Sequence, residues 1–145
     1  MAEAILKSLV AKRPDAAEWH IESAGTWARE GAPAAILSQL AVQDKGIDIS
    51  NHRSKPVTRV LLHHFDLVLT MERQQKEGLI LEFKQFADRI YMLSEMVGRF
   101  EDVPDPIGGE FIYYQATAKL MEGFLSGGLE KIYQLARKND AKVVA

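Results

Sequence analysis

Short apolar runs alternate with amphipathic segments along this chain, and this alternation limits the folds that it can adopt. Phe65–Thr70 and Arg89–Leu93 are too short for helices and suit strands, whereas Glu72–Phe86 between them has a helical period. A strand, a helix and a second strand in this order form a parallel pair with a crossing helix. The sequence therefore predicts an α/β fold built on a parallel sheet.

The other segments extend this alternation to the whole chain. Ala2–Val10 repeats apolar residues at helical spacing, and Trp19–Ser23 alternates apolar and polar residues as a strand does. Further helices are expected over Pro33–Gly46, Val57–His64 and Tyr113–Lys138, the last weakened at Gly127–Gly128, with loops at Ile47–Pro56 and Ser94–Glu110. We expect three layers, with helices on both faces of the sheet, in a single domain covering residues 1–145.

Composition excludes several classes of function. Eighteen Lys and Arg against twenty Asp and Glu give a net charge of -2, so no nucleic-acid partner is expected. No apolar run could span a bilayer, and the first residues lack a signal peptide's features, which predicts a cytoplasmic protein without a membrane partner. The absence of cysteine removes disulfides, thiolate metal ligands and a thiol nucleophile, and no zinc spacing or glycine-rich phosphate loop is present. We therefore expect neither a metal nor a cofactor.

One candidate for acid–base chemistry stands in Asp102–Gly109. Asp105 lies between two prolines that restrict the backbone, and the glycines after it allow a substrate to approach closely. A general acid near neutral pH needs a raised pKa, from partial burial or a nearby anion. The alternative is an ordinary solvated loop, because Asp-Pro and Gly-Gly are common turn dipeptides.

The start of the sequence is unusual for a helix. The first helix begins at residue 1, so no residue stands before it to cap its first N–H groups, and no strand precedes it. We expect an α/β unit whose opening strand and loop are missing.

Five segments in order resemble the low-molecular-weight protein tyrosine phosphatase family. They are Met1–Leu6, Ser23–Thr26, Gly46–Ser50 with His52-Arg53, Phe65–Leu69 with Met71, and Asp105–Gly109. The resemblance implies a phosphotyrosine protein phosphatase I-like fold without its first strand. In the family that strand leads into a Cys-x5-Arg loop directly before the Met-Ala-Glu-Ala helix, and here neither is present.

The resemblance also implies residue roles. A thiolate held under backbone N–H groups attacks phosphorus, and an aspartate, here Asp105, protonates the leaving group and later activates water. Ile107 stands where tyrosine phosphatases usually carry an aromatic residue against the substrate ring. Ser23 and His52 match positions that support the phosphate loop from behind. Without that loop they would have nothing to support.

The family's substrate is a phosphorylated protein side chain, but this chain lacks the nucleophile. We therefore expect it to be inactive as it stands, with Met1 an internal methionine of a longer phosphatase. Protein-arginine phosphatases share the Asp-Pro-x-Gly-Gly form and are one alternative, and a non-catalytic pseudophosphatase that binds a partner is another. Aspartyl chemistry with magnesium at Asp102 or Asp105 ranks last, and arsenate reductases need cysteines that are absent here.

The missing strand also bears on stability. Unpaired backbone groups on its neighbours would each cost about 1–3 kcal/mol if buried. We expect a marginal protein that is prone to self-association through unpaired strands.

Overall fold

A computed structural model describes residues 1–144, and within it the chain forms two compact units. The first unit comprises Met1–Pro56 and Asp105–Ser126, and the second comprises Val57–Pro104 and the chain from Gly127 onward. Each unit has a buried apolar core of its own.

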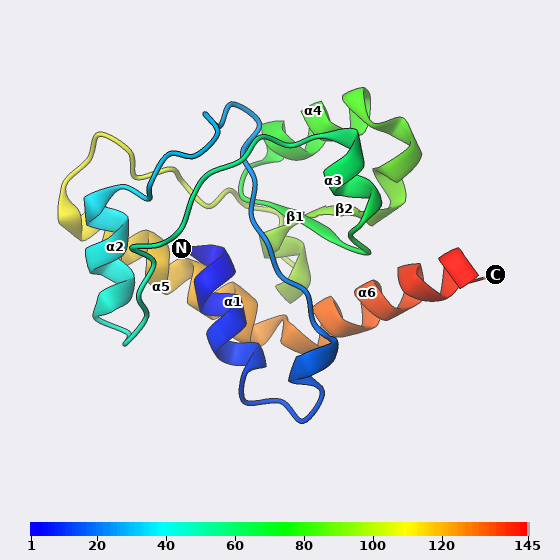
Figure 1. Ribbon diagram of the computed structural model, residues 1–145, viewed down its shortest axis with the longest axis horizontal. Coiled ribbons are helices and arrows are strands. Elements are labelled where there is room, and N and C mark those ends of the chain that lie inside the picture. Colours follow the sequence, from blue (N-terminus) through cyan, green and yellow to red (C-terminus); the bar gives the residue numbers. More distant parts are fainter. Residues whose placement is uncertain (145) are drawn as a thin grey trace. The chain divides into compact units, whose positions relative to one another are not determined.

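The second unit contains the predicted strand–helix–strand arrangement (Figure 1). Strand β1 (Val68–Thr70) pairs in parallel with β2 (Ile90–Met92), with Val68 opposite Ile90 and Thr70 opposite Met92. Helix α4 (Arg73–Glu82) connects the strands and contacts both of them. The prediction of an α/β fold with a parallel sheet is thereby confirmed, although the sheet of the described residues has only two strands.

Helix α4 ends earlier than its sequence period suggests. It stops at Glu82, and a 3-10 segment, η2 (Lys84–Arg89), takes its place. Phe83 and Phe86 are both buried, in one cluster with Leu79 and Ile90. Residues three apart lie on one face of a 3-10 turn, so the tighter turn brings both rings into the core.

Helix α6, over Leu129–Val144, forms hydrogen bonds with the segments that flank the two strands. Lys131 Nζ donates to the carbonyl of Glu95 at 2.9 Å, in η3 (Leu93–Val97) directly after β2. Asn139 is 4% exposed, and its Nδ2 donates to the carbonyl of Asp66, just before β1, at 2.8 Å. Helix α6 thus hydrogen-bonds to the backbone next to each of the two strands. Helix α3 (Arg59–His63), capped by Thr58, adds Leu62 to the core of this unit.

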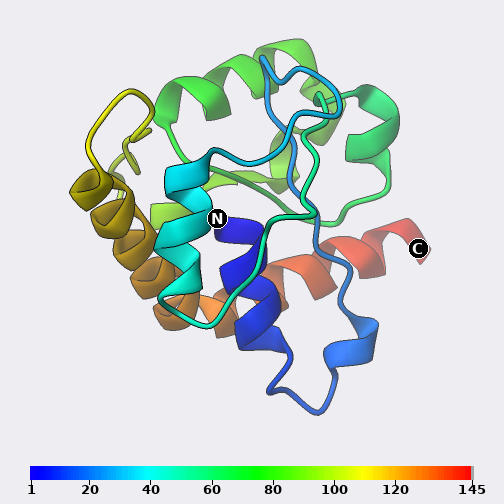
Figure 2. The same ribbon diagram turned by 60° about the vertical axis from the view of Figure 1, so that its left-hand side comes forward.

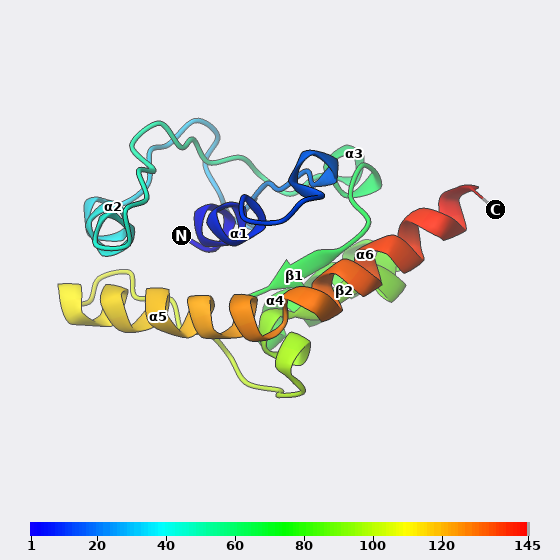
Figure 3. The same ribbon diagram turned by 90° about the horizontal axis from the view of Figure 1, so that it is seen from below.

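The first unit is built from three helices. Helix α1 (Ala2–Val10) and helix α2 (Ile36–Gln43) lie on the same side of α5 (Phe111–Gly127) and cross it, as Figure 3 shows with α5 lengthwise and the other two nearly end-on (see also Figure 2). A short 3-10 turn, η1 (Ala16–Glu18), follows α1. The core of this unit includes Ala41, Tyr114 and Ala118, against which Met1, Leu37 and Phe111 pack.

The predicted strand Trp19–Ser23 is not a strand in the described structure. Its backbone begins extended, with Trp19 at φ -90° and ψ 129°, but no ladder forms along it. Single bridges connect Gly25 with Pro56 and Pro33 with Arg53. The prediction of a strand is therefore wrong for this segment of the described structure, because a strand also needs a neighbouring strand to accept its hydrogen bonds.

The break predicted in the terminal helix is confirmed. Helix α5 ends at Gly127 and α6 begins at Leu129, so Gly128 alone separates them. Glycine has the lowest helix propensity of any residue except proline, and two in succession end the helix. Within residues 1–144, no helix combines the length and the apolarity that a membrane crossing requires.

The carboxylate of Asp66 makes a testable contribution to stability. Burial and the nearby charge of Asp140 raise the pKa of Asp66, and the charge of Arg89 opposes this only in part. An acid whose pKa is raised on folding favours the folded state when protonated, and its contribution is lost as the pH rises from the unfolded to the folded pKa. We therefore expect Asp66→Asn to raise the urea midpoint at neutral pH and to change it little in acid.

Asp140→Asn removes one of the two causes and serves as the matched comparison. It should shift the midpoint in the same direction by less, because burial of Asp66 persists. A stabilising effect of Asp66→Asn that is equally large in acid would contradict this explanation.

Candidate functional site

The candidate acid, Asp105, lies in a tightly turned loop before α5. Its side chain is exposed, and Oδ1 accepts a hydrogen bond from the N–H of Ile107 at 3.0 Å. The N–H of Gly109 donates to the carbonyl of Pro106 at 2.9 Å and closes the next turn. These bonds hold the backbone around Asp105. The Asp105 side chain therefore lacks the partial burial that we expected of a general acid.

Both glycines of the loop are required by its geometry. Gly108 has a φ of 78°, a conformation in which an L side chain is strained. A Cβ on Gly109 would stand 3.0 Å from the carbonyl oxygen of Pro106 and 3.2 Å from Cδ2 of Tyr113. The Gly-Gly pair therefore has a structural explanation in this loop, independent of any substrate.

The residues just before Asp105 are fixed to the carboxyl end of β1. The N–H of Val103 donates to the carbonyl of Met71 at 2.8 Å, and Val103 is buried. Asp102 Oδ1 accepts a hydrogen bond from the N–H of Arg73 at 2.7 Å, at the first residue of α4. Asp102 thus caps that helix, which satisfies a free N–H and places negative charge at the helix N-terminus.

A second group of polar side chains surrounds the first turn of α1. Glu3 Oε2 accepts a hydrogen bond from Ser23 Oγ at 2.5 Å and lies 3.7 Å from His52 Nδ1. Glu3 Oε1 accepts from Lys7 Nζ at 2.6 Å. Three segments that are distant in sequence therefore meet at one carboxylate.

The charge of Glu3 is held by its neighbours. Burial acts to raise the pKa of Glu3, but the hydrogen bonds from Lys7 and Ser23, with the nearby positive charges, outweigh it and lower the pKa. A carboxylate in the first turn of a helix is also favoured by the helix dipole.

The structure brings Ser23 and His52 to one carboxylate, that of Glu3, which the sequence analysis did not single out. Glu3 was noticed only as part of the Met-Ala-Glu-Ala segment. Its signal was available, because an acid in the first turn of an uncapped helix stabilises the free N–H groups there. The support of a phosphate loop by Ser23 and His52 stays a prediction.

Several large apolar side chains of the first unit are exposed. Ile107 is 76% exposed and Trp27 is 98% exposed, and Tyr113 at the start of α5 is exposed as well. The role of Ile107 against a substrate stays a prediction. Among the described residues, no group of three or more His, Asp or Glu side chains is placed to hold a metal ion.

Comparison with known proteins gives a consistent result. The chain matches the family described as "Low molecular weight phosphotyrosine protein phosphatase" over residues 1–140. A protein-arginine-phosphatase of Bacillus subtilis is 34% identical over 126 residues, covering 86% of this chain and 82% of that protein. A probable low molecular weight protein-tyrosine-phosphatase EpsP of Ralstonia nicotianae is 27% identical, covering 78% and 77%.

Solved structures agree in fold. The YwlE arginine phosphatase from Geobacillus stearothermophilus superposes with a TM-score of 0.82 at 27% identity, covering 92% of this chain and 83% of that one. A low molecular weight protein tyrosine phosphatase from T. tengcongensis gives a TM-score of 0.81 at 34% identity, covering 90% and 88%.

The contacts of Glu3 predict a pH-dependent loss of stability on mutation. Glu3→Gln should destabilise the protein by about 1–3 kcal/mol at neutral pH, because hydrogen bonds to a charged group are lost. A lowered pKa gives stability that is present above the unfolded pKa and lost as the pH falls through the folded one. The penalty should therefore shrink in acid, as measured by urea denaturation at several pH values. A penalty that does not vary with pH would refute the charge-based explanation.

Replacing glycine by alanine should have opposite effects on stability at Gly108 in the loop after Asp105 and at Gly78 in α4. Gly108→Ala should cost about 1–2 kcal/mol, since its positive φ strains any side chain. Gly78 in α4 is exposed and has open space around it, so Gly78→Ala should gain up to about 1 kcal/mol from helix propensity. Thermal denaturation of both variants checks this, and equal effects at the two sites would argue against it.

Proposed function

Because the chain belongs to the low molecular weight phosphotyrosine protein phosphatase family, we propose that its site receives a phosphorylated protein side chain, with Asp105 as the general acid. The observation that carries this proposal is the ordered loop around Asp105, whose turns leave the carboxylate exposed to a ligand. Because the side chain is not buried, a bound phosphoryl group would be the nearby anion that a general acid needs. The carboxyl group would give its proton to the leaving atom as the bond to phosphorus breaks.

The same proposal assigns the first turn of α1 a supporting role. Glu3 orients Ser23 and His52 at the N-terminus of that helix, where the N–H groups are favourable to an anion. A phosphate loop at this point would find both side chains already positioned. Ser23 and His52 would act through that loop, without touching the phosphoryl group.

The 145-residue chain is proposed to be inactive by itself. It contains no cysteine, so no cysteinyl-phosphate can form on it and Asp105 has no bond cleavage to assist. Removing the attacking group of a covalent mechanism typically costs many powers of ten in rate. Activity would require a segment with a thiolate and an arginine, as in the Cys-x5-Arg loop of the family.

Phosphoarginine is the substrate class that we favour for the completed site. Supporting this choice, the Bacillus relative at 34% identity is a protein-arginine-phosphatase, and Ile107 is aliphatic where an aromatic residue would stack on a phosphotyrosine ring. Phosphotyrosine is the second candidate, supported by the description of the matched family. Non-catalytic binding of a phosphorylated partner is the third, and the lack of a nucleophile in an otherwise ordered chain favours it.

The test compares this chain with a version extended at its N-terminus by a strand and a Cys-x5-Arg-Ser-Pro loop. The present chain should not hydrolyse p-nitrophenyl phosphate, and the extended version should. In the extended version, Asp105→Asn should lower kcat about 10²–10⁴-fold, as expected for loss of a general acid. Asp102→Asn, which affects the helix cap and not the proton donor, is the matched control and should lose less.

Each outcome has a separate meaning. Turnover by the 145-residue chain would overturn its proposed inactivity, and an unaffected Asp105→Asn rate would overturn the role of Asp105. Comparing phosphoarginine and phosphotyrosine peptides on the extended version decides the substrate class. If neither is hydrolysed although the protein is folded, binding of phosphopeptides to the present chain becomes the supported function.

A further inference from the structure

The side chain of Tyr113 lies against the loop that carries Asp105. Tyr113 is in the first turn of α5, and a Cβ on Gly109 would stand 3.2 Å from its Cδ2 and 3.7 Å from its Cβ. The same Cβ would stand 3.0 Å from the carbonyl oxygen of Pro106, the residue directly after Asp105. The tyrosine ring and the backbone next to the candidate acid therefore both lie close to one point beside Gly109.

The ring of Tyr113 is exposed although its backbone is fixed. Its neighbour Tyr114 is 5% exposed and belongs to the core of the first unit, whereas Tyr113 is 60% exposed. The N–H of Tyr113 donates to the carbonyl of Glu110 at 3.0 Å at the start of α5. An aromatic side chain that is already held in a helix and against a turn loses little freedom when a ligand binds it.

Two glycines leave bare backbone along the chain between Ile107 and α5. Gly108 and Gly109 carry no side chain, so a flat group could approach their peptide groups closely. Ile107, before the glycines, is exposed and aliphatic, and Tyr113, after them, is exposed and aromatic. Of these two side chains, only Tyr113 offers an aromatic face to a ligand.

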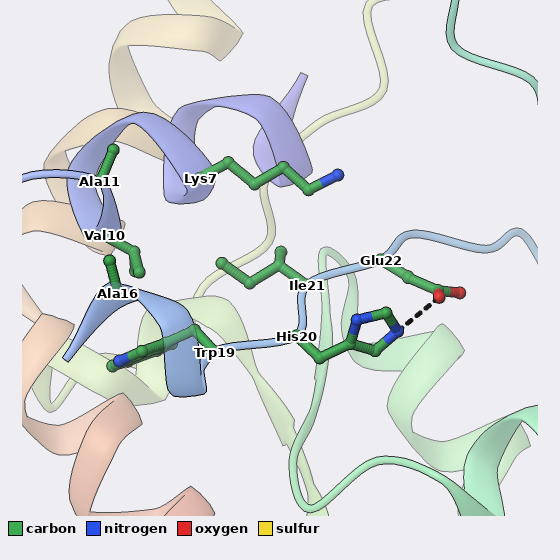
Figure 4. A pocket seen from close by; sticks show the side chains of 8 residues that line it. All are labelled: Lys7, Val10, Ala11, Ala16, Trp19, His20, Ile21 and Glu22. Atoms are coloured by element: carbon green, nitrogen blue, oxygen red, sulfur yellow. Dashed lines mark hydrogen bonds and ion pairs between the residues drawn. The ribbon is translucent and has the colours of Figure 1, made fainter.

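A hollow of about 410 Å³ is another place in the first unit where a ligand could bind. Trp19 forms part of its apolar wall, and Figure 4 shows His20 bonded to Glu22 in its lining. The basic side chains of the hollow are already paired, His20 with Glu22 at 2.6 Å and Lys7 with Glu3 at 2.6 Å. A phosphorylated ligand would have to displace one of these pairs, which favours the loop before α5 as its binding place.

We propose that Tyr113 is a specificity-determining residue, whose ring packs on the planar group that carries the phosphoryl group of the substrate. A guanidinium and a phenol ring are both planar, and an aromatic face attracts both, the guanidinium also through its positive charge. A phosphorylated serine has no planar group and gains nothing from the ring. The inference rests on the proposed function, because it assumes a phosphorylated side chain beside Asp105.

Titration of the 145-residue chain with phosphopeptides tests this contact without requiring activity. Three peptides of one sequence carry phosphoarginine, phosphotyrosine or phosphoserine, and NMR follows the ring signals of Tyr113, assigned with Tyr113→Phe. We expect the first two peptides to shift these signals and the third to leave them unchanged. The affinity for those two peptides should fall about 3–10-fold in Tyr113→Leu, as for loss of one aromatic contact, and persist in Tyr113→Phe.

Ile112→Ala is the matched control, because it removes an exposed apolar side chain from the same turn of α5. It should leave the affinity for all three peptides unchanged. An unmoved Tyr113 ring, an equal response to phosphoserine, or shifts confined to Trp19 in the hollow would each overturn the inference.

The version extended with the Cys-x5-Arg-Ser-Pro loop separates recognition from catalysis. Tyr113→Leu should raise KM for the phosphoarginine and phosphotyrosine peptides about 3–10-fold with little change in kcat, because a binding contact is lost. A purely structural role of the ring, in which its loss loosens the loop around Asp105, would instead lower kcat and leave KM unchanged. The peptide whose KM rises more identifies the planar group that the ring prefers.

Failure of the inference and failure of the proposed function give different results. If Asp105→Asn lowers kcat but Tyr113→Leu leaves KM unchanged, the proposed function stands and Tyr113 is not a specificity residue. If the folded extended version hydrolyses no peptide, the proposed phosphatase activity fails, and the titration of the 145-residue chain alone decides the role of Tyr113.

Discussion

The parallel pairing of β1 with β2 is the interaction on which the positions of Asp102 and Val103 depend. Both strands end at the same edge, so the backbone leaving β1 at Met71 is available to Val103. Asp102 then bonds the first N–H of α4, the helix that connects the two strands. A short sheet of two strands thus fixes both the helix and the chain that leads to Asp105.

The first unit depends on a different interaction, the carboxylate of Glu3. It is partly buried, so its charge is tolerable only because Lys7, Ser23 and His52 surround it. In return it fixes the loop around His52 and the extended chain at Ser23 against the start of α1. A serine and a histidine that sequence resemblance assigns to one function are held together by an acid from a third segment.

The sequence predicted the elements better than their ends and their partners. Periodicity located α1 and α2 because burial of one helix face imposes it, and short apolar runs located both strands. It overestimated the length of α4, because the 3-10 turn that follows the helix depends on the packing of Phe83 and Phe86 in the core. Trp19–Ser23 was read as a strand because alternation reports an extended chain, whereas pairing depends on residues elsewhere.

The candidate site was predictable to a similar extent. Asp105 was found because Pro and Gly around it are local signals, and the structure adds the turn that explains them. Glu3 and the capping role of Asp102 were missed because each acts on a residue many positions away: Ser23, His52 and Arg73. Contacts of that kind leave no period in the sequence. Whether residues 1–145 act as the single domain that the composition predicts stays a prediction.

The loop around Asp105 and the group of side chains around Glu3 are held by different contacts. The loop around Asp105 is held by its own turns, by Gly108 and by the cap from Asp102, none of which involves a phosphate loop. The carboxylate of Glu3 is held by its contacts with Lys7, Ser23 and His52, which also involve no phosphate loop. Neither arrangement needs the nucleophile in order to form. The turns around Asp105 and the contacts of Glu3 therefore both form in a chain that contains no thiolate.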